Sequence, residues 1–264
     1  MNIYSNNFFN KNLKENLFFL VNKCIKIALA ERFKDIRQKK DGSIITKADN
    51  EIHSCIINAL LTLYPDIPII SEEGKFEEKS FTNKAYWLID PIDGSSSYAR
   101  GKSGYTINIA FIKDGIPLMG IIAHPPSNTI WYGKNKNAII SINGNEKIIS
   151  IKQFSKNNLN IVMSKNYDQL TKELVDKMTK VNIKYYSSSL KFCKIAEGKA
   201  DIYPRLQSIH KWDIAAGDAI LRAAGGIVFN ENGKEILYNT IGSETGKFFA
   251  LSSVKLWENI KNKI

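Results

Sequence analysis

The sequence predicts a mixed α/β protein, α+β in its first half, and three observations support this. Apolar residues recur at helical spacing near the N-terminus, strand-forming runs flank Asp114-Gly115, and helices alternate with strands after about residue 151. The chain has 264 residues, 44% of them hydrophobic, which is enough to bury a substantial core. We therefore expect two regions: residues 1–150 with helices and an antiparallel-leaning sheet, and residues 151–264 with more α/β character.

The first region is expected to begin with two amphipathic helices. Apolar residues on one face predict helices over residues 13–33 and about 47–64, with a basic loop over residues 34–43 between them. Thr46 followed by Asp49 resembles the start signal of the second helix. Strands are expected over residues 67–71, 85–89, 106–113, 116–123, 129–133 and 138–142, and Asp114-Gly115 is the strongest hairpin signal.

The second region alternates between short helices and strands. Strands are expected over residues 159–164, 183–186 and 200–203, and helices over residues 168–180, 190–197 and 212–224. Gly225-Gly226 would end the last helix.

The charge balance is strongly basic, with a formal net charge of +11 and a sequence pI of about 9.4. Such a positive charge could bind RNA, an anionic membrane or an acidic substrate. The lysines are scattered along the whole chain, however, which favours solvated faces over a nucleic-acid site. A non-catalytic protein that binds RNA or membranes stays as the alternative of a different class.

The cysteines Cys24, Cys55 and Cys193 are far apart and odd in number, and no Cys-x-x-Cys pair occurs. Neither a zinc site nor a disulfide framework is indicated, and a reducing cytosol fits best. No apolar run reaches the roughly 18 residues of a membrane span. We expect a cytoplasmic protein, and peripheral association with the cytoplasmic face of the inner membrane stays open.

The densest chemical signal lies at the end of the strand predicted from residue 85. Asp90 and Asp93 stand three residues apart, with Pro91 between them to stiffen the turn, and Gly94 and Ser95 follow. Crowded carboxylates repel one another unless a cation holds them, and Mg²⁺ prefers such oxygen ligands. An acidic turn without a metal is the competing interpretation of this segment alone.

Three further acids stand at element ends beside apolar runs. Glu72 follows the strand predicted from residue 67, and Asp49 and Asp213 stand at expected helix starts. Helix capping alone could explain Asp49 and Asp213. One shared metal cluster explains all these positions together, and it is the interpretation that we adopt.

The motifs carry a family resemblance. Residues 90–95 (DPIDGS), 71–73 (SEE) and 212–217 (WDIAAG) resemble the inositol monophosphatase superfamily in order and spacing. Residues 188–193 (SSLKFC), with 105–110, 196–198 and 203–205, are similar to its 3'(2'),5'-bisphosphate nucleotidase branch, the CysQ type. The resemblance covers about residues 41–238.

The resemblance implies a fold, a cofactor and residue roles. The fold would be a layered αβαβα sandwich, and the cofactor would be two or three Mg²⁺ ions. Asp49 would bond the Ser95 hydroxyl, and Ser95 with Glu72 would orient and deprotonate the attacking water. The implied metal ligands are Glu72, Asp90, Asp93, Asp213 and the Ile92 carbonyl; the implied substrate contacts are Ile92, Asp93, Gly94, Ser95, Lys191 and Asp213.

The implied reaction is hydrolysis of the 3'-phosphate of adenosine 3',5'-bisphosphate, giving AMP and phosphate. Lys191 would hold the second phosphate, whereas a lone helical lysine is ordinarily solvated. Inositol phosphates or fructose 1,6-bisphosphate are the alternative substrates. This chain has Ser95 where the family usually has Thr and Ser187 where the branch usually has Gly, and residues 96–104 also differ. A nucleic-acid partner is not expected, and the oligomeric state is left open.

Overall fold

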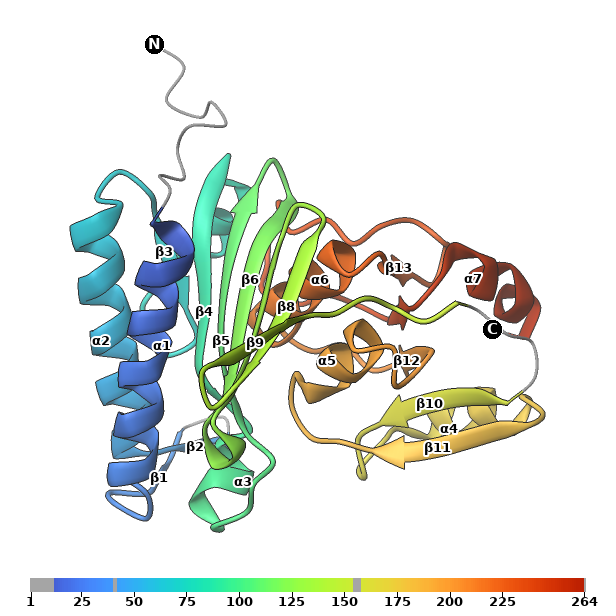
Figure 1. Ribbon diagram of the computed structural model, residues 1–264, viewed down its shortest axis with the longest axis horizontal. Helices are drawn as coiled ribbons and strands as arrows, with labels where there is room; N and C mark the ends of the chain where they lie inside the picture. The colour runs from blue at the N-terminus through green and yellow to red at the C-terminus, as the bar shows by residue number, and fades with distance from the viewer. Residues whose placement is uncertain (1–11, 40–41, 154–157, 264) are drawn as a thin grey trace.

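The computed structural model describes residues 12–39, 42–153 and 158–263, and these form five alternating layers. Figure 1 shows them in order: α1 and α2, a seven-stranded sheet, α5 and α6, a five-stranded sheet, and finally α4 and α7. The layered αβαβα sandwich is therefore confirmed. The helices are α1 Leu13–Ala30, α2 Lys47–Leu63, α3 Ser95–Ala99, α4 Gln169–Asp176, α5 Leu190–Ala196, α6 Lys211–Ala223 and α7 Val254–Ile260, with 3-10 turns at Glu78–Thr82, Pro125–Ser127 and Lys261–Lys263.

The seven-stranded sheet, called the large sheet below, runs in the order β3-β4-β5-β6-β7-β8-β9. Only β3 and β4 pair in parallel, and every later pair is antiparallel, as the hairpin signals predicted. Its strands are β3 Ile69–Ser71, β4 Ala85–Asp93, β5 Thr106–Lys113, β6 Ile116–His124, β7 Thr129–Lys134, β8 Asn137–Ile142 and β9 Asn145–Ile148.

The second sheet runs in the order β11-β10-β12-β14-β13, with a parallel half and an antiparallel half. Its strands are β10 Leu159–Met163, β11 Val181–Tyr185, β12 Ile202–Arg205, β13 Ile227–Asn230 and β14 Phe248–Leu251. The large sheet thus ends at residue 148 and the second sheet begins at residue 159.

Three hydrophobic cores fill the spaces between the layers. One joins α1 and α2 to the large sheet, the next joins the large sheet to α5, α6 and the second sheet, and the last lies under α4 and α7. Among the described residues no helix is both long enough and apolar enough to cross a membrane.

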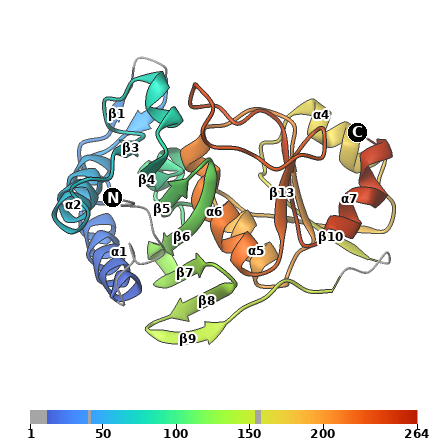
Figure 2. The same cartoon turned by 90° about the horizontal axis from the view of Figure 1, so that it is seen from above.

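Helix α6 lies unusually close to the large sheet because small residues meet there. A Cβ atom on Gly120 would stand 2.2 Å from the Ala216 carbonyl oxygen, and one on Gly133 would stand 2.5 Å from the Cα of Ile220. Figures 1 and 2 both place α6 between the two sheets. This close packing brings Asp213, in the first turn of α6, to the end of β4.

The structure differs from the sequence prediction in several places. The expected loop over residues 34–43 contains a two-residue strand, β1 Arg37–Gln38, which pairs with β2 Ile44–Ile45. Helix α4 ends at Asp176 rather than at residue 180, and Lys180, with a left-handed φ of 56°, stands directly before β11. The elements β13, β14 and α7 were not predicted, and neither were α3 and β9.

Candidate active site

The parallel pairing of β3 and β4 brings two acidic segments together. Ser71 is the register partner of Ile89, and the main-chain N–H of Glu72 donates to the Ile89 carbonyl at 3.1 Å. Parallel strands end at the same sheet edge. Glu72 therefore follows β3 beside the position where Asp90 stands in β4.

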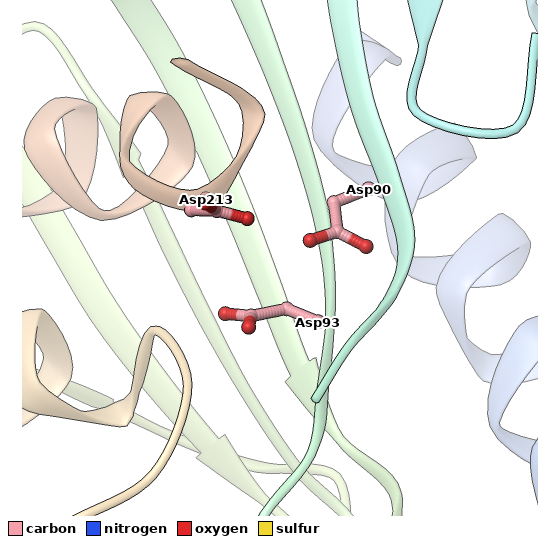
Figure 3. A group of neighbouring side chains, drawn as sticks. All are labelled: Asp90, Asp93 and Asp213. Carbon is pink, nitrogen blue, oxygen red and sulfur yellow. The ribbon is translucent and has the colours of Figure 1, made fainter. Parts of the chain in front are cut away.

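The end of β4 turns two carboxylates toward one space. The ladder between β4 and β5 is interrupted between Asp90 and Asp93, where Pro91 has no N–H to donate. Figure 3 shows the side chains of Asp90 and Asp93 facing that of Asp213 from α6. Each of the three offers an oxygen, and these oxygens lie within 4.8 Å of one another.

The electrostatics of this acidic cluster favour a bound cation. Asp90 is buried, and neither of its carboxylate oxygens receives a hydrogen bond in the described structure. Burial first, and then the charges of Glu72, Asp93 and Asp213, raise the pKa of Asp90 well above its usual value. Burial and the charges of Asp93 and Glu72 likewise raise the pKa of Asp213. Carboxylate oxygens are the donors that a hard divalent ion takes, and the buried, unpartnered carboxylate of Asp90 beside two further carboxylates therefore fits Mg²⁺.

Ser189 connects two members of the cluster, and the sequence interpretation missed this role. Its hydroxyl lies 2.9 Å from Asp93 Oδ2 and 2.7 Å from the main-chain oxygen of Asp213, and it accepts from Asn108 Nδ2 at 2.9 Å. A hydroxyl has one proton, which serves either oxygen. Ser189 thus ties the end of β4 to the start of α6.

Asp49 both caps α2 and holds Ser95. Its Oδ2 accepts from the Thr46 main-chain N–H at 2.8 Å and from the Thr46 hydroxyl at 2.5 Å, which completes a capping box. Its Oδ1 accepts from Ser95 Oγ at 2.8 Å, and that hydroxyl also lies 2.9 Å from the Ile92 carbonyl oxygen. Burial raises the pKa of Asp49, whereas the hydrogen bonds from Thr46 and Ser95 oppose the rise.

Gly94 occupies a position that no other residue would fit. Its φ is 95°, and a Cβ atom there would stand 2.5 Å from Ser188 Oγ and 2.7 Å from the Gly104 carbonyl oxygen. The turn at Gly94 ends β4 and allows α3 to begin at Ser95.

A cavity of about 680 Å³ lies over the acidic cluster. Lys39, next to β1, donates to Glu73 Oε1 at 2.6 Å and lies 3.4 Å from Glu72 Oε1. Burial raises the pKa of Glu73 to about 7. The cavity lining includes Glu72, Asp90, Ile92, Asp93, Gly94, Ser95 and Asp213, with Arg37 and Arg100 at its sides.

A second pocket, of about 220 Å³, shares Asp93 and Asp213 with the first and also holds Lys191 and Arg205. Lys191 is buried, so the alternative of a solvated lysine is wrong. Its ammonium donates to the Ser188 carbonyl at 2.6 Å and to the Tyr186 carbonyl at 3.4 Å. Burial lowers the pKa of Lys191 to about 8. The pocket thus sets two cationic side chains beside the acidic cluster.

Comparison with known proteins shows the family to which this chain is related. A profile of the Inositol monophosphatase family matches residues 12–256. The chain belongs to the inositol monophosphatase family.

Named relatives and solved structures of this family agree with the match. The 3'(2'),5'-bisphosphate nucleotidase CysQ of Buchnera aphidicola is 35% identical over 219 residues, which is 82% of each chain. The protein of that name from Escherichia coli K12 is 34% identical over 206 residues, covering 77% of this chain and 83% of that one. The crystal structure of CysQ from Bacteroides thetaiotaomicron has a TM-score of 0.80 at 24% identity, covering 93% and 98% of the two chains, and supports the fold.

The structure of this inositol monophosphatase family member gathers the residues singled out in the sequence. Seven of them line the cavity over the acidic cluster, Asp49 lies behind Ser95, and Lys191 lies in the adjoining pocket. Lys39, Ser189 and Arg205 were not assigned roles from the sequence. For Arg205 the signal was present, because the YPR motif already resembled the nucleotidase branch.

Proposed function

We propose that the protein is a magnesium-dependent phosphomonoesterase that converts adenosine 3',5'-bisphosphate to AMP and phosphate. The observation that carries the proposal is the cationic pocket of Lys191 and Arg205, which adjoins the acidic cluster and shares Asp93 and Asp213 with it. The relatives at about 35% identity, which are named 3'(2'),5'-bisphosphate nucleotidases, support the same substrate.

In this proposal the acidic cluster holds two or three Mg²⁺ ions. Glu72, Asp90, Asp93, Asp213 and the carbonyl of Ile92 are the ligands. When bound, Mg²⁺ neutralises negative charge on the phosphate and on the attacking and leaving oxygens. Ser189 keeps Asp93 and Asp213 in register through its contacts with both.

The chain's own groups position the water and the phosphate. Asp49 holds the Ser95 hydroxyl at 2.8 Å, so that Ser95 and Glu72 would orient the water and the Glu72 carboxylate would accept its proton. The main-chain N–H groups of Gly94 and Ser95 face the phosphate. Here the left-handed turn at Gly94 lets the backbone approach the anion without a Cβ atom in the way.

The second phosphate of the substrate would lie against Lys191 and Arg205. An ammonium has three donors, and two of those of Lys191 go to the Ser188 and Tyr186 carbonyls, so one remains for an anion. The nucleoside then has room in a groove of about 1240 Å³ that shares Asp93 and Gly94 with the cavity and is flanked by Tyr186 and Trp131.

A phosphate-release panel with Mg²⁺ tests the proposal. We expect kcat/KM to be highest for adenosine 3',5'-bisphosphate among nucleotide bisphosphates, inositol phosphates and fructose 1,6-bisphosphate. Preference for an inositol or fructose phosphate would retain the chemistry but reject the substrate. Absence of phosphate release from the whole panel, by protein that binds Mg²⁺, would reject the enzyme itself and favour a binding protein.

A further inference from the structure

The imidazole of His53 contacts the turn that carries Glu72. His53 belongs to α2, and its Nδ1 lies at hydrogen-bonding distance, 2.8 Å, from Ser71 Oγ at the end of β3. The ring also lies against Gly74, where a Cβ atom would stand 3.5 Å from His53 Cε1. The proposed reaction gives His53 no role, although its ring touches both ends of the segment from Ser71 to Gly74.

That segment is a tight turn with Glu72 at its corner. The main-chain N–H of Gly74 donates to the Ser71 carbonyl at 3.0 Å, and the N–H of Glu72 is held by the Ile89 carbonyl at 3.1 Å. Ser71 is buried, so the imidazole takes the place that water has at an exposed hydroxyl. Strand β4 thus holds the middle of the turn, and His53 contacts its two ends.

Helix α2 reaches both groups that orient the water in the proposed reaction. Asp49 and His53 are four residues apart in α2, and residues at that spacing lie on the same face of a helix. Asp49 holds the Ser95 hydroxyl at 2.8 Å. One turn further along, His53 holds the hydroxyl of Ser71, which directly precedes Glu72. One helix face therefore fixes Ser95 and the Glu72 turn relative to each other.

We propose that His53 is a positioning residue, which sets the Glu72 carboxylate through its bond to Ser71. The inference rests on the proposed function, because Glu72 is there both a Mg²⁺ ligand and the acceptor of the water's proton. Removing a group that orients a metal ligand typically lowers metal affinity or activity by about 10- to 100-fold. His53 acts through the residue before the ligand, so we expect the lower end of that range. It does not line the pocket of Lys191 and Arg205, so KM should not move.

Kinetics of three variants test this role. His53→Ala should raise the Mg²⁺ concentration for half-maximal activity about 10-fold and lower kcat, while KM for adenosine 3',5'-bisphosphate in saturating Mg²⁺ stays within about twofold of wild type. His53→Asn keeps a polar side-chain atom near the position of Nδ1, so it should bring kcat and the Mg²⁺ dependence back to within about threefold of wild type. The control Ser54→Ala changes an exposed residue of the same helix and should match wild type.

Calorimetric titration of Mg²⁺ into substrate-free protein separates this inference from the proposed function. His53→Ala should bind Mg²⁺ about 10-fold more weakly than wild type, whichever phosphate ester the enzyme prefers. If the wild type hydrolysed no compound of the panel and the variant still bound Mg²⁺ more weakly, the proposed function would fail and the positioning of Glu72 would stand. Wild-type protein that binds no Mg²⁺ would overturn both.

A double-mutant cycle with Ser71 identifies the route of the effect. Ser71→Ala should reproduce the changes seen in His53→Ala, and the double variant should be no worse than either, because both substitutions remove the same contact. Wild-type kcat and Mg²⁺ affinity in His53→Ala, even at a lowered unfolding temperature, would make His53 a purely structural residue and overturn the proposal. Additive effects of the two substitutions, or a change confined to KM, would overturn it as well. If circular dichroism shows that His53→Ala does not fold, Ser71→Ala decides by the same criteria.

Discussion

Replacement of Lys191 by methionine tests the basis of substrate choice most directly. Lys191 is buried at the start of α5, so Met keeps the volume of the side chain and removes its charge and its three donors. The carbonyls of Ser188 and Tyr186 lose their bonds to the ammonium. Leaving such buried acceptors without a partner costs about 1–3 kcal/mol of folding free energy, so circular dichroism and the unfolding temperature accompany the kinetics.

The kinetic effect follows from the one donor that Lys191 has left for an anion. A hydrogen bond to a charged group contributes about 1.5–3 kcal/mol. Its loss should lower kcat/KM for adenosine 3',5'-bisphosphate roughly 10- to 150-fold, chiefly through KM. Hydrolysis of adenosine 3'-monophosphate, which lacks the second phosphate, should stay within about twofold of wild type.

The control variant is Lys172→Met, which removes an exposed lysine of α4 that lines none of these pockets and whose ammonium pairs with Asp176. It should change neither substrate's kinetics. If Lys191→Met lowered kcat/KM equally for both substrates, Lys191 would act on the phosphate that is hydrolysed and not on the second phosphate. Unchanged kinetics on both would remove it from the substrate site altogether, and the reasoning about the second pocket would be wrong.

The remaining predictions concern the metals, the nucleophile and pH. Asp93→Asn removes one charge from the acidic cluster at nearly constant volume, so turnover in saturating Mg²⁺ should be lost with the circular dichroism spectrum unchanged. Ser95→Ala removes the hydroxyl bonded to Asp49 and should lower kcat by roughly 10²–10⁴, while Ser95→Thr should stay active; equal turnover by Ala and wild type would deny the hydroxyl a role. The pKa of Lys191 near 8 means that its charge is present below that pH and lost above it, so KM for the bisphosphate, but not for the monophosphate, should rise as the pH passes 8. The raised pKa values of Asp90 and Asp213 mean that the protonated carboxyls stabilise the metal-free fold at low pH, and that contribution is lost as the pH rises through the raised values. Mg²⁺ binds the ionised carboxylates, so the increase in unfolding temperature that Mg²⁺ causes should become larger as the pH rises, as differential scanning fluorimetry can show.

The sequence was most informative where chemistry and secondary structure coincide. The hairpin at Asp114-Gly115 predicted the pairing of β5 with β6, and alternating strands after it predicted the antiparallel part of the large sheet. Acids at the ends of apolar runs predicted that Glu72, Asp90 and Asp213 would meet. These predictions succeeded because each depends on a few residues that are close in the sequence, and short motifs mark the turns and the ends of strands and helices.

The structure adds what depends on packing between distant segments. No local pattern could show that Gly120 and Gly133 let α6 approach the large sheet, although this contact places Asp213 beside β4. Strands β13 and β14 have only four residues each, and they form the β13 side of the second sheet. Segments this short carry too little sequence pattern to predict a strand, and the structure shows them as strands because they pair with neighbouring strands.

The cationic side of the site shows why charge counts alone mislead. A net charge of +11 made scattered, solvated lysines the simplest interpretation, and for most of the chain it needs no revision. Burial separates Lys191 from that background, because its ammonium is held by carbonyl oxygens beside the acidic cluster. Lys211 is equally buried and equally bonded to carbonyls, those of Thr240 and Gly242, and both ammonium groups lie over aromatic rings, yet Lys211 lines none of the three pockets described above. Burial of a lysine therefore makes it a candidate for a substrate contact only when a pocket adjoins it, and the position of that pocket comes from the structure and not from the composition.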